Sequence, residues 1–372
     1  MRAVFIPLPS MIISEPPAAE PLTDTFRYIN GMDDVALQQV CRDAGAKISH
    51  ADTLKAYVFR HGVTDWQSMH ELPQTLKSHL QAHISVLTAE VTALQQSDDG
   101  THKLLLKMPD GKEVESVLIP GAGRLTQCIS TQIGCAIGCE FCLTATAGLT
   151  RNLSCAEMIS EVMAARQFTR SPVRNIVLMG MGEPLHNYDE VAKFIRLVTD
   201  PKGMAFSPRR VTLSTAGLVP QIYRMMEDGL DCSLAVSLNA SNDETRSRIM
   251  PINRKYSMHA LLEALRAYVD KHGRKRVLIE YVMLAGVNDQ THHAKELIQA
   301  LDGIASTVNL LPFNAFPGSP WQRPSDACVT AFRTELSKAG FVAVVRESRG
   351  RDISAACGQL KTEVIHRRKI TG

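Results

Sequence analysis

The spacing of apolar residues changes twice along the chain. Between Asp33 and His83 they recur every three or four positions, as on amphipathic helices, which predicts a helical domain over residues 26–85. From Val86 to Pro120 apolar and polar residues alternate, and Asp110-Gly111 separates two such runs. Because Asp-Gly favours a tight turn between strands, we expect a β-hairpin linker over residues 86–120.

Beyond residue 120, strand-like and helix-like segments alternate, as in parallel α/β sheets. A β-like run from Leu125 to Gln132 comes first, and Ser154 and Glu157 match a capping box that opens a helix. The pattern predicts an α/β fold with a partial (β/α)6 barrel, open on one side, over residues 121–347. The six strands that we expect are 175–179, 210–214, 232–238, 277–283, 308–312 and 341–346.

Polar residues or glycine follow the apolar part of several expected strands. In (β/α) barrels the residues that contact ligands gather where the strands end, so we expect a ligand site there. These residues are Gly182, Glu183, Ser214, Ser237, Asn239 and Asn314.

Three cysteines, Cys135, Cys139 and Cys142, form a C-x3-C-x2-C pattern. Three thiolates are a soft ligand set, which favours an iron–sulfur cluster or zinc. Structural zinc normally takes four protein ligands, whereas three thiolates on a four-iron cluster leave one iron open to a small molecule. Gly134 and Gly138 suit a loop whose backbone approaches a cluster closely. A zinc clip and three unpaired structural cysteines are the alternatives.

Composition narrows the class of protein. Hydrophobic residues make up 45% and charged residues 21%, and there is no 18-residue apolar run, so we expect a globular cytoplasmic protein without a membrane span. Nine cysteines, three of them clustered, favour metal and redox chemistry over a disulfide scaffold. The other cysteines in apolar segments are expected to be structural: Cys41, Cys155, Cys232 and Cys328. Nothing in the sequence demands more than a monomer.

The two ends of the chain differ from the rest. Residues 1–25 are rich in proline and are expected to form a flexible arm. Residues 348–372 form a C-terminal loop and a basic tail, with Cys357 between small residues and near arginines, where a thiol pKa can fall. A net charge of +3 does not by itself indicate a nucleic-acid partner, so local basic groups matter more. The candidates are Arg254-Lys255, residues 274–276 and residues 366–369.

Many segments, in order, resemble the RlmN/Cfr family of radical S-adenosylmethionine (SAM) adenine methyltransferases, in particular its RlmN branch. The resemblance covers the chain from about residue 26 onward. It is carried by Val114–Pro120, Cys128–Cys142, Gly148–Leu153, Met179–Leu185, Arg209–Gly217, Met250–Tyr256, Asn309–Gly318 and Ala355–Leu360. It implies a [4Fe-4S] cluster on Cys135, Cys139 and Cys142, with SAM on its open iron.

The resemblance also implies a reaction. One SAM methylates Cys357, and a second yields a 5′-deoxyadenosyl radical that activates this methyl group for addition to adenine. Cys128 then pairs with Cys357 in a transient disulfide, and Glu115 is the general base. The family acts on C2 of an adenosine in 23S ribosomal RNA, and some members also act on the tRNA anticodon loop. Residues 26–85 would then help to bind RNA, and a donor such as flavodoxin would supply electrons.

The SAM contacts implied by the resemblance are Gly182, Glu183, Ser214, Ser237, Leu238, Asn239 and Asn314. The chain departs from the family pattern at Asn239, where histidine is usual. Two further departures are Leu149, where phenylalanine is common, and Pro73-Gln74, where a lysine is common. These positions bear on SAM affinity and on the RNA contact surface, and they are compatible with a diverged paralogue that acts on another RNA.

Three other readings remain open from the sequence. The first is methylation of C8 of the same adenosine, as in the Cfr branch. The second is a non-enzymatic zinc or RNA-binding module, which predicts a colourless protein indifferent to loss of Cys128 and Cys357. The third is a radical SAM enzyme with another substrate, which the Cys128 and Cys357 pair argues against.

Overall fold

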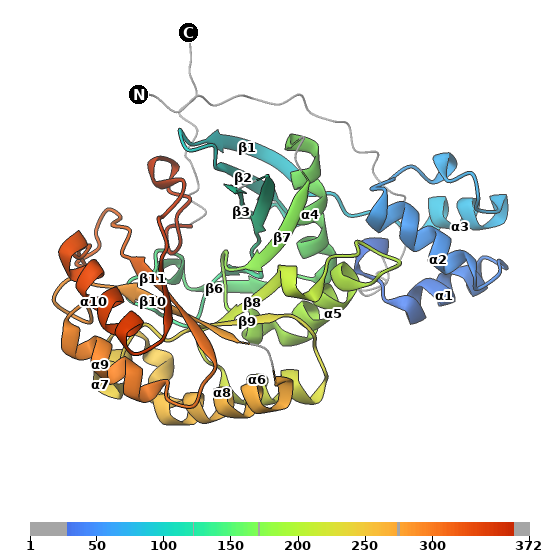
Figure 1. Cartoon of the computed structure of the whole chain (residues 1–372). Helices are drawn as coiled ribbons and strands as arrows, with labels where there is room; N and C mark the ends of the chain where they lie inside the picture. The colour runs from blue at the N-terminus through green and yellow to red at the C-terminus, as the bar shows by residue number, and fades with distance from the viewer. Residues whose placement is uncertain (1–27, 122, 170–171, 274–275, 361–372) are drawn as a thin grey trace, which may run out of the picture.

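The computed structural model describes residues 28–360 except 122, 170–171 and 274–275. Its main feature is a ten-stranded sheet in the order β1-β2-β3-β4-β7-β8-β9-β10-β11-β12 (Figure 1). The strands are β1 (Glu90–Gln96), β2 (His102–Lys107), β3 (Glu113–Gly121), β4 (Arg124–Cys128), β7 (Val173–Leu178), β8 (Val211–Thr215), β9 (Ser233–Ser237), β10 (Val277–Met283), β11 (Ser306–Pro312) and β12 (Val342–Val345). The strands β1 to β4 pair antiparallel, and all pairs from β4 to β12 are parallel.

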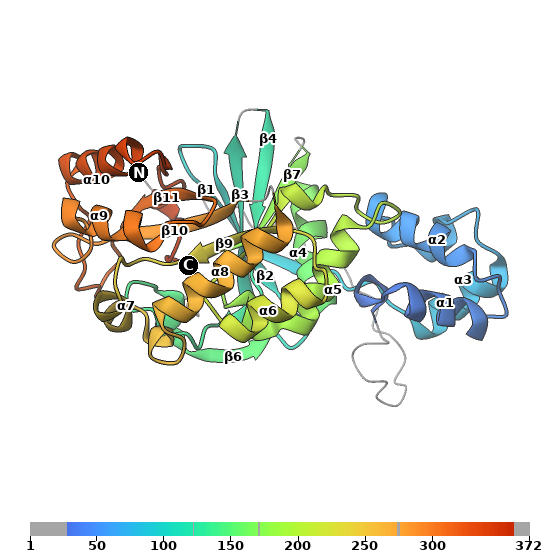
Figure 2. The same ribbon diagram turned by 60° about the horizontal axis from the view of Figure 1, so that its bottom comes forward.

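Helices wrap around the outside of the curved sheet (Figures 1 and 2). They are α4 (Cys155–Phe168), α5 (Tyr188–Thr199), α6 (Val219–Glu227), α7 (Asp243–Ile249), α8 (Met258–His272), α9 (Thr291–Ala300) and α10 (Asp326–Lys338). The predicted capping box is confirmed, because Ser154 accepts a hydrogen bond from the Glu157 N–H and the Glu157 side chain accepts one from the Ser154 N–H. In the part of the chain that the structure describes, no helix is long and apolar enough to span a membrane.

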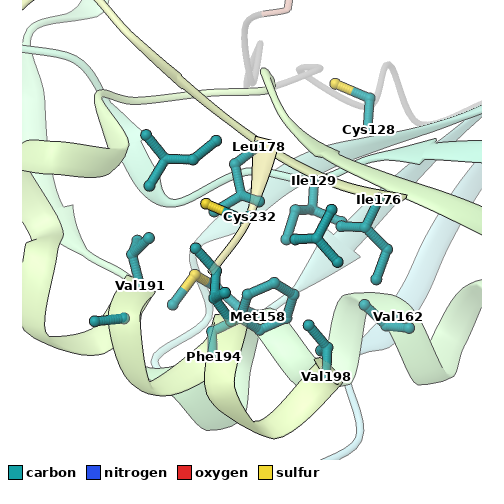
Figure 3. Close-up of a cluster of buried hydrophobic side chains, with 14 of the residues drawn as sticks. Cys128, Ile129, Met158, Val162, Ile176, Leu178, Val191, Phe194, Val198 and Cys232 are labelled. Carbon is teal, nitrogen blue, oxygen red and sulfur yellow. The ribbon is translucent and has the colours of Figure 1, made fainter. Parts of the chain in front are cut away.

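Strand β10 illustrates how the sheet separates core from barrel interior. Val277, Ile279, Tyr281 and Met283 are buried, whereas the alternate side chains of the strand are only half-buried. Since alternate residues of a strand point to opposite faces, one face packs on the helices and the other stays partly open. The buried face belongs to a large hydrophobic core, part of which lies between β4, β7, α4 and α5 (Figure 3). The inner face of this strand is therefore partly accessible to solvent.

The predicted barrel strands are all found. The six expected after residue 170 correspond to β7 to β12, and an open α/β barrel is confirmed. One expectation needs correction: the run Leu125–Gln132 is not a single strand, because β4 ends at Cys128 and a separate strand β5 (Gln132–Gly134) pairs with β6 (Leu149–Asn152). The predicted hairpin is β2 and β3, joined by a turn in which Gly111 has a φ of 79°, and β1 extends it.

The N-terminal helices are α1 (Asp34–Asp43), α2 (His50–Lys55) and α3 (Gln74–His83). They lie beside α5 in both overall views (Figures 1 and 2). The Lys55 side chain is buried between Asp34 and Asp200, and the Arg60 side chain donates to the carbonyl of Pro201. Lys55 joins these helices to the segment after α5, because a buried lysine needs anionic partners.

Four cysteines outside the site are expected to be structural, and three of them are buried. Cys41, Cys155 and Cys232 are buried, and Cys328 is partly exposed. The expected flexible arm at residues 1–25, Arg274, Lys275 and the basic residues 366–369 lie outside the described residues.

Candidate active site

The three-cysteine loop begins directly after β5 and is closed by the β5–β6 ribbon. The Cys135 N–H donates to the carbonyl of Gly148 at 2.9 Å, and the Cys142 N–H donates to the carbonyl of Cys139 at 3.1 Å. Gly134 has a φ of 79°, and a Cβ there would lie 1.8 Å from the Gly148 carbonyl oxygen. Only glycine fits this position, because the loop and its return strand touch through their backbones.

The donor set fits an iron–sulfur cluster. Burial raises the pKa of the Cys135 and Cys139 thiols, and the nearby Glu183 carboxylate adds to this effect. A metal offsets that penalty, because it binds the thiolate form. Within the described residues, no group of three or more His, Cys, Asp or Glu side chains surrounds a position for one metal ion. That observation concerns a single ion, whereas each thiolate of an iron–sulfur cluster binds its own iron atom.

Gly182 and Glu183 follow β7 and lie against β5. A Cβ on Gly182 would lie 2.5 Å from the Gln132 Cβ, and the Glu183 N–H donates to the Gln132 Oε1 at 2.8 Å. The Glu183 carboxylate accepts from the N–H groups of Leu185 at 3.0 Å and Ala216 at 2.7 Å. Burial nevertheless raises its pKa to about 7. A buried carboxylate beside the cysteine loop suits a cationic ligand group.

The remaining predicted SAM contacts fall into two groups. Ser214, Ser237 and Asn314 are half-buried on or just after neighbouring strands, and the buried Oδ1 of Asn314 accepts no hydrogen bond from the described residues. Leu238 and Asn239 are buried. The Asn239 Oδ1 accepts from the Val282 N–H at 2.8 Å, and its Nδ2 donates to the Met250 sulfur at 3.2 Å. The Asn239 side chain therefore stabilises the fold through hydrogen bonds within the protein.

A buried arginine fixes the same strand ends. Arg246 is 0% exposed and donates to the carbonyls of Leu238 at 3.1 Å and Ala216 at 2.6 Å. It also donates to the Asn253 Oδ1 at 2.8 Å. Burial lowers its pKa to about 10, against the opposing effect of the Cys139 thiolate, so a positive charge lies near the cysteine loop. A cation there complements the negative charge of bound thiolates.

Strand register places Glu115 and Cys128 on one face of the sheet. Cys128 pairs with Val117 across β3 and β4, and Glu115 lies two residues from Val117. Paired residues, and residues two apart, share a face. Figure 3 shows the Cys128 thiol pointing away from the hydrophobic cluster that contains Ile129 and Met158. Glu115 is 5% exposed and pairs with the Lys103 ammonium at 2.9 Å, contrary to the usual solvent exposure of a lone strand glutamate.

Cys357 lies in a loop that docks on the cysteine loop. The Leu143 N–H donates to the carbonyl of Gly358 at 2.7 Å, and the Thr144 hydroxyl donates to the carbonyl of Leu360 at 2.5 Å. Burial raises the pKa of Cys128, and the charge of the Cys357 thiolate raises it further, so Cys357 lies within electrostatic range of Cys128. Both are free thiols.

The expected low pKa of Cys357 is wrong. Cys357 is exposed, as expected, but the protein around its thiol raises the pKa to about 11. Glu280 raises the pKa as well, and the opposing effect of Arg346 is smaller. The arginines close to Cys357 in the sequence therefore do not lower its pKa overall, because the effect of Arg346 is smaller than that of the surrounding protein.

The β1–β2 turn holds the Cys357 loop from the other side. The Ser97 hydroxyl donates to the Asp352 Oδ1 at 2.6 Å, and the Asp99 Oδ2 accepts from the Gly350 N–H at 3.0 Å. The Lys103 ammonium is 3.4 Å from the Ser354 carbonyl oxygen. The hairpin therefore carries Glu115 and fixes the segment that carries Cys357.

Comparison with known proteins agrees with this geometry. The profile of the Radical SAM superfamily matches residues 129–298. The dual-specificity RNA methyltransferase RlmN of Pelobacter propionicus is 45% identical over 90% of this chain and 96% of its own length. The RlmN of Geobacter sulfurreducens is 45% identical over 91% of this chain and 93% of its own. The chain belongs to the RlmN family of radical SAM RNA methyltransferases.

A solved structure supports the same assignment of the fold. A radical SAM methyltransferase from Sphaerobacter thermophilus aligns with a TM-score of 0.85 and 41% identity, covering 91% of this chain and all of that one. The expected radical SAM fold is thus confirmed. The zinc or RNA-binding module without enzymatic activity is set aside by the family.

Sequence reasoning missed Lys103 and Arg246. Lys103 could have been found, because the Asp110-Gly111 turn fixes the register that sets Leu105 opposite Glu115, and Lys103 is two residues further along the same face. Arg246 offered no such signal, since it lies in a charged segment that reads as a solvated helix face.

Proposed function

We propose that the chain methylates C2 of an adenosine in 23S ribosomal RNA, and of a tRNA adenosine, through a methylated Cys357. The observation that carries the proposal is that the Cys357 loop docks on the three-cysteine loop and on the β1–β2 turn, while Cys128 and Glu115 share one face of the adjoining sheet. A methyl-accepting thiol, a second thiol and a carboxylate are the groups that covalent transfer through a thioether requires. The RlmN-named relatives, described as dual-specificity RNA methyltransferases, support RNA as the substrate.

In this proposal Cys135, Cys139 and Cys142 hold a [4Fe-4S] cluster, which supplies the electron for reductive cleavage of SAM when it is bound. Glu183 binds the SAM ammonium, for which its buried carboxylate is suited. The unpaired Oδ1 of Asn314 and the hydroxyls of Ser214 and Ser237 accept or donate hydrogen bonds to SAM. Leu238 and Asn239 contribute through their backbone, because their side chains are buried in the fold.

Release of the product follows from two protein groups. After the Cys357-bound carbon joins adenine C2, the adduct is a radical. It would return one electron to the cluster that supplied one, and Glu115 accepts the C2 proton, so that the electron pair of the C–H bond restores the aromatic ring. The Cys128 thiolate then attacks the Cys357 sulfur. A sulfur–sulfur bond forms, the sulfur–carbon bond breaks, and its electron pair leaves with the carbon and takes up a proton to give the methyl group. A dithiol reductant reopens the disulfide before the next turnover.

The RNA is expected to approach over the C-terminal ends of the strands. Arg254 and Lys255 are exposed there, next to Pro251, whose ring is 3.8 Å from a Cβ built on Gly138 of the cysteine loop. The target adenosine must leave its stack, because C2 is hidden inside a helix. Helices α1 to α3 would act as an RNA-binding accessory domain, and a flavodoxin-type donor would supply electrons in the cytoplasm. Arg276 precedes β10, at the other end of the barrel, and is less suited to this role.

The direct test is Cys128→Ala in the anaerobically reconstituted enzyme with SAM, reductant and 23S RNA fragments or tRNA. The variant should still methylate Cys357 and should trap a covalent protein–RNA adduct, since no thiol remains to break the sulfur–carbon bond. Cys328→Ala, which removes a partly exposed thiol on α10, is the matched control and should turn over normally. Normal release of methylated RNA by Cys128→Ala would rule out the proposed thiol pair.

A further inference from the structure

Lys103 of β2 forms an ion pair with Glu115, the proposed general base. Its Nζ lies 2.9 Å from the Glu115 Oε1, and both side chains are largely buried, at 12% and 6% exposed. The same Nζ is 3.4 Å from the carbonyl oxygen of Ser354, three residues before Cys357. One ammonium group thus contacts both the base and the loop that carries the methylated thiol.

Ser354, whose carbonyl oxygen contacts Lys103, has an uncommon backbone conformation. Its φ is 52°, in the left-handed region, which is uncommon for residues other than glycine. The Gly350–Ala355 segment bends back on itself, because the Ala355 N–H donates to the Gly350 carbonyl at 2.8 Å. A cation on the Ser354 carbonyl is therefore placed at the bend that sets the direction of the chain toward Cys357.

A second ion pair of β2, formed with β1, supplies a comparison. Lys107 of β2 pairs with Glu90 at 3.2 Å, with the side chains 44% and 53% exposed. Exposed pairs of that kind contribute little, because water screens them. The Lys103–Glu115 pair is largely shielded from water, so loss of the ammonium removes a positive charge that water cannot readily replace.

We propose that Lys103 is the positioning residue for product release: it holds Glu115 as an oriented carboxylate and ties that carboxylate to the Cys357 loop. The inference rests on the proposed function, in which Glu115 takes the C2 proton. In that step the adenine C2–H bond breaks, the proton moves to a Glu115 oxygen, and the electron pair remains in the ring. Lys103 makes no bond to the substrate and loses no proton.

The experiment uses the full-length reconstituted enzyme and separates three events. SAM cleavage is measured as 5′-deoxyadenosine, Cys357 methylation by peptide mass spectrometry, and product release as the decay of the covalent protein–RNA adduct. Lys103→Met keeps the length of the side chain and removes the charge. Lys103→Gln retains a donor without charge, Lys103→Arg retains the charge, and Lys107→Met is the matched control on the same strand.

For Lys103→Met and Lys103→Gln, adduct decay should slow by about ten- to a hundredfold, the range expected when a general base is impaired. Its pH profile should shift to higher pH, because the carboxylate is harder to ionise without the cation. SAM cleavage and Cys357 methylation should stay near the wild-type level. Lys103→Arg should recover most of the rate, and Lys107→Met should match the wild type.

Two results would overturn the inference. One is adduct decay in Lys103→Met at the wild-type rate and pH profile while Glu115→Gln traps the adduct. The other is loss of Cys357 methylation in both uncharged variants in step with slower release, which would give Lys103 a general structural role. Failure of the proposed function looks different, because then the wild type forms no methylated RNA and Glu115→Gln traps no adduct.

Discussion

The carboxylate of Asp99 accepts a hydrogen bond from the backbone N–H of Gly350 at 3.0 Å, which joins the β1–β2 turn to the start of the Cys357 loop. The Asp99 Oδ1 also accepts from the Thr101 N–H at 2.9 Å, so the carboxylate bridges both segments. Burial alone would raise the pKa of Asp99, but hydrogen bonds from Thr101 and Gly350 outweigh it and hold the pKa at about 2. The ionised form therefore stabilises the docked loop.

Asp99→Asn should lower the free energy of unfolding of the apo-protein at pH 7 by about 1 kcal/mol, the usual contribution of such hydrogen bonds. The pKa in the fold lies below the ordinary value of 3.8, so the stabilisation is complete above pH 4 and disappears as the pH falls toward 2. Urea unfolding between pH 7 and pH 3 should show the difference from wild type shrinking. Asp98→Asn removes the charge of an exposed neighbour and should have little effect; equal effects of the two variants would contradict the bridge.

Gly134→Ala should impair assembly of the iron–sulfur site, because a Cβ there would lie 1.8 Å from the Gly148 carbonyl oxygen. Iron content and the visible absorption of the reconstituted protein measure this. The matched control is Gly45→Ala just after α1, far along the chain from the cysteine loop, whose φ of 63° is also positive but whose Cβ would meet no atom within 4 Å. The control should lose about 1–2 kcal/mol of stability and keep its iron. Full iron incorporation in Gly134→Ala would show that the loop tolerates displacement of its return strand.

Arg246→Met should lower the free energy of unfolding of the apo-protein by about 3 kcal/mol, since several carbonyl oxygens lose a charged donor inside the fold. SAM binding should weaken too, because Arg246 fixes the ends of β8 and β9. Arg248→Met, on the exposed side of the same helix, is the control and should change stability little. Urea unfolding and calorimetric SAM titration give both quantities; an unaltered stability in Arg246→Met would contradict the role of the buried cation.

Asn314→Ala separates ligand binding from stability. The Oδ1 of Asn314 has no donor among the described residues, so its removal should leave the apo-protein as stable as the wild type or slightly more so. SAM binding to the reconstituted protein should weaken by about tenfold, the effect of one lost hydrogen bond of about 1.4 kcal/mol. Unchanged SAM affinity would remove Asn314 from the proposed contacts.

The barrel could be predicted from sequence because its strands are short apolar runs that alternate with helix-like segments, and several of them are followed closely by a polar or glycine residue. The same holds for the cysteine loop, since its spacing is local. Burial of charged residues could not be predicted, because Lys55 and Arg246 have the same sequence surroundings as solvated charges. The approach of Cys357 to Cys128 depends on loop docking through Leu143 and Gly358, contacts between distant segments that no local pattern encodes.

The most direct measurement is nucleoside mass spectrometry of 23S RNA fragments and tRNA after anaerobic incubation with the reconstituted enzyme, SAM and a reductant. We predict that the wild type forms 2-methyladenosine together with 5′-deoxyadenosine. With Cys357→Ala we predict no methylated adenosine in either RNA. Formation of 8-methyladenosine instead would contradict the proposed C2 position while keeping the thiol pair. Absence of any methylated adenosine with an intact cluster would contradict the proposed substrate.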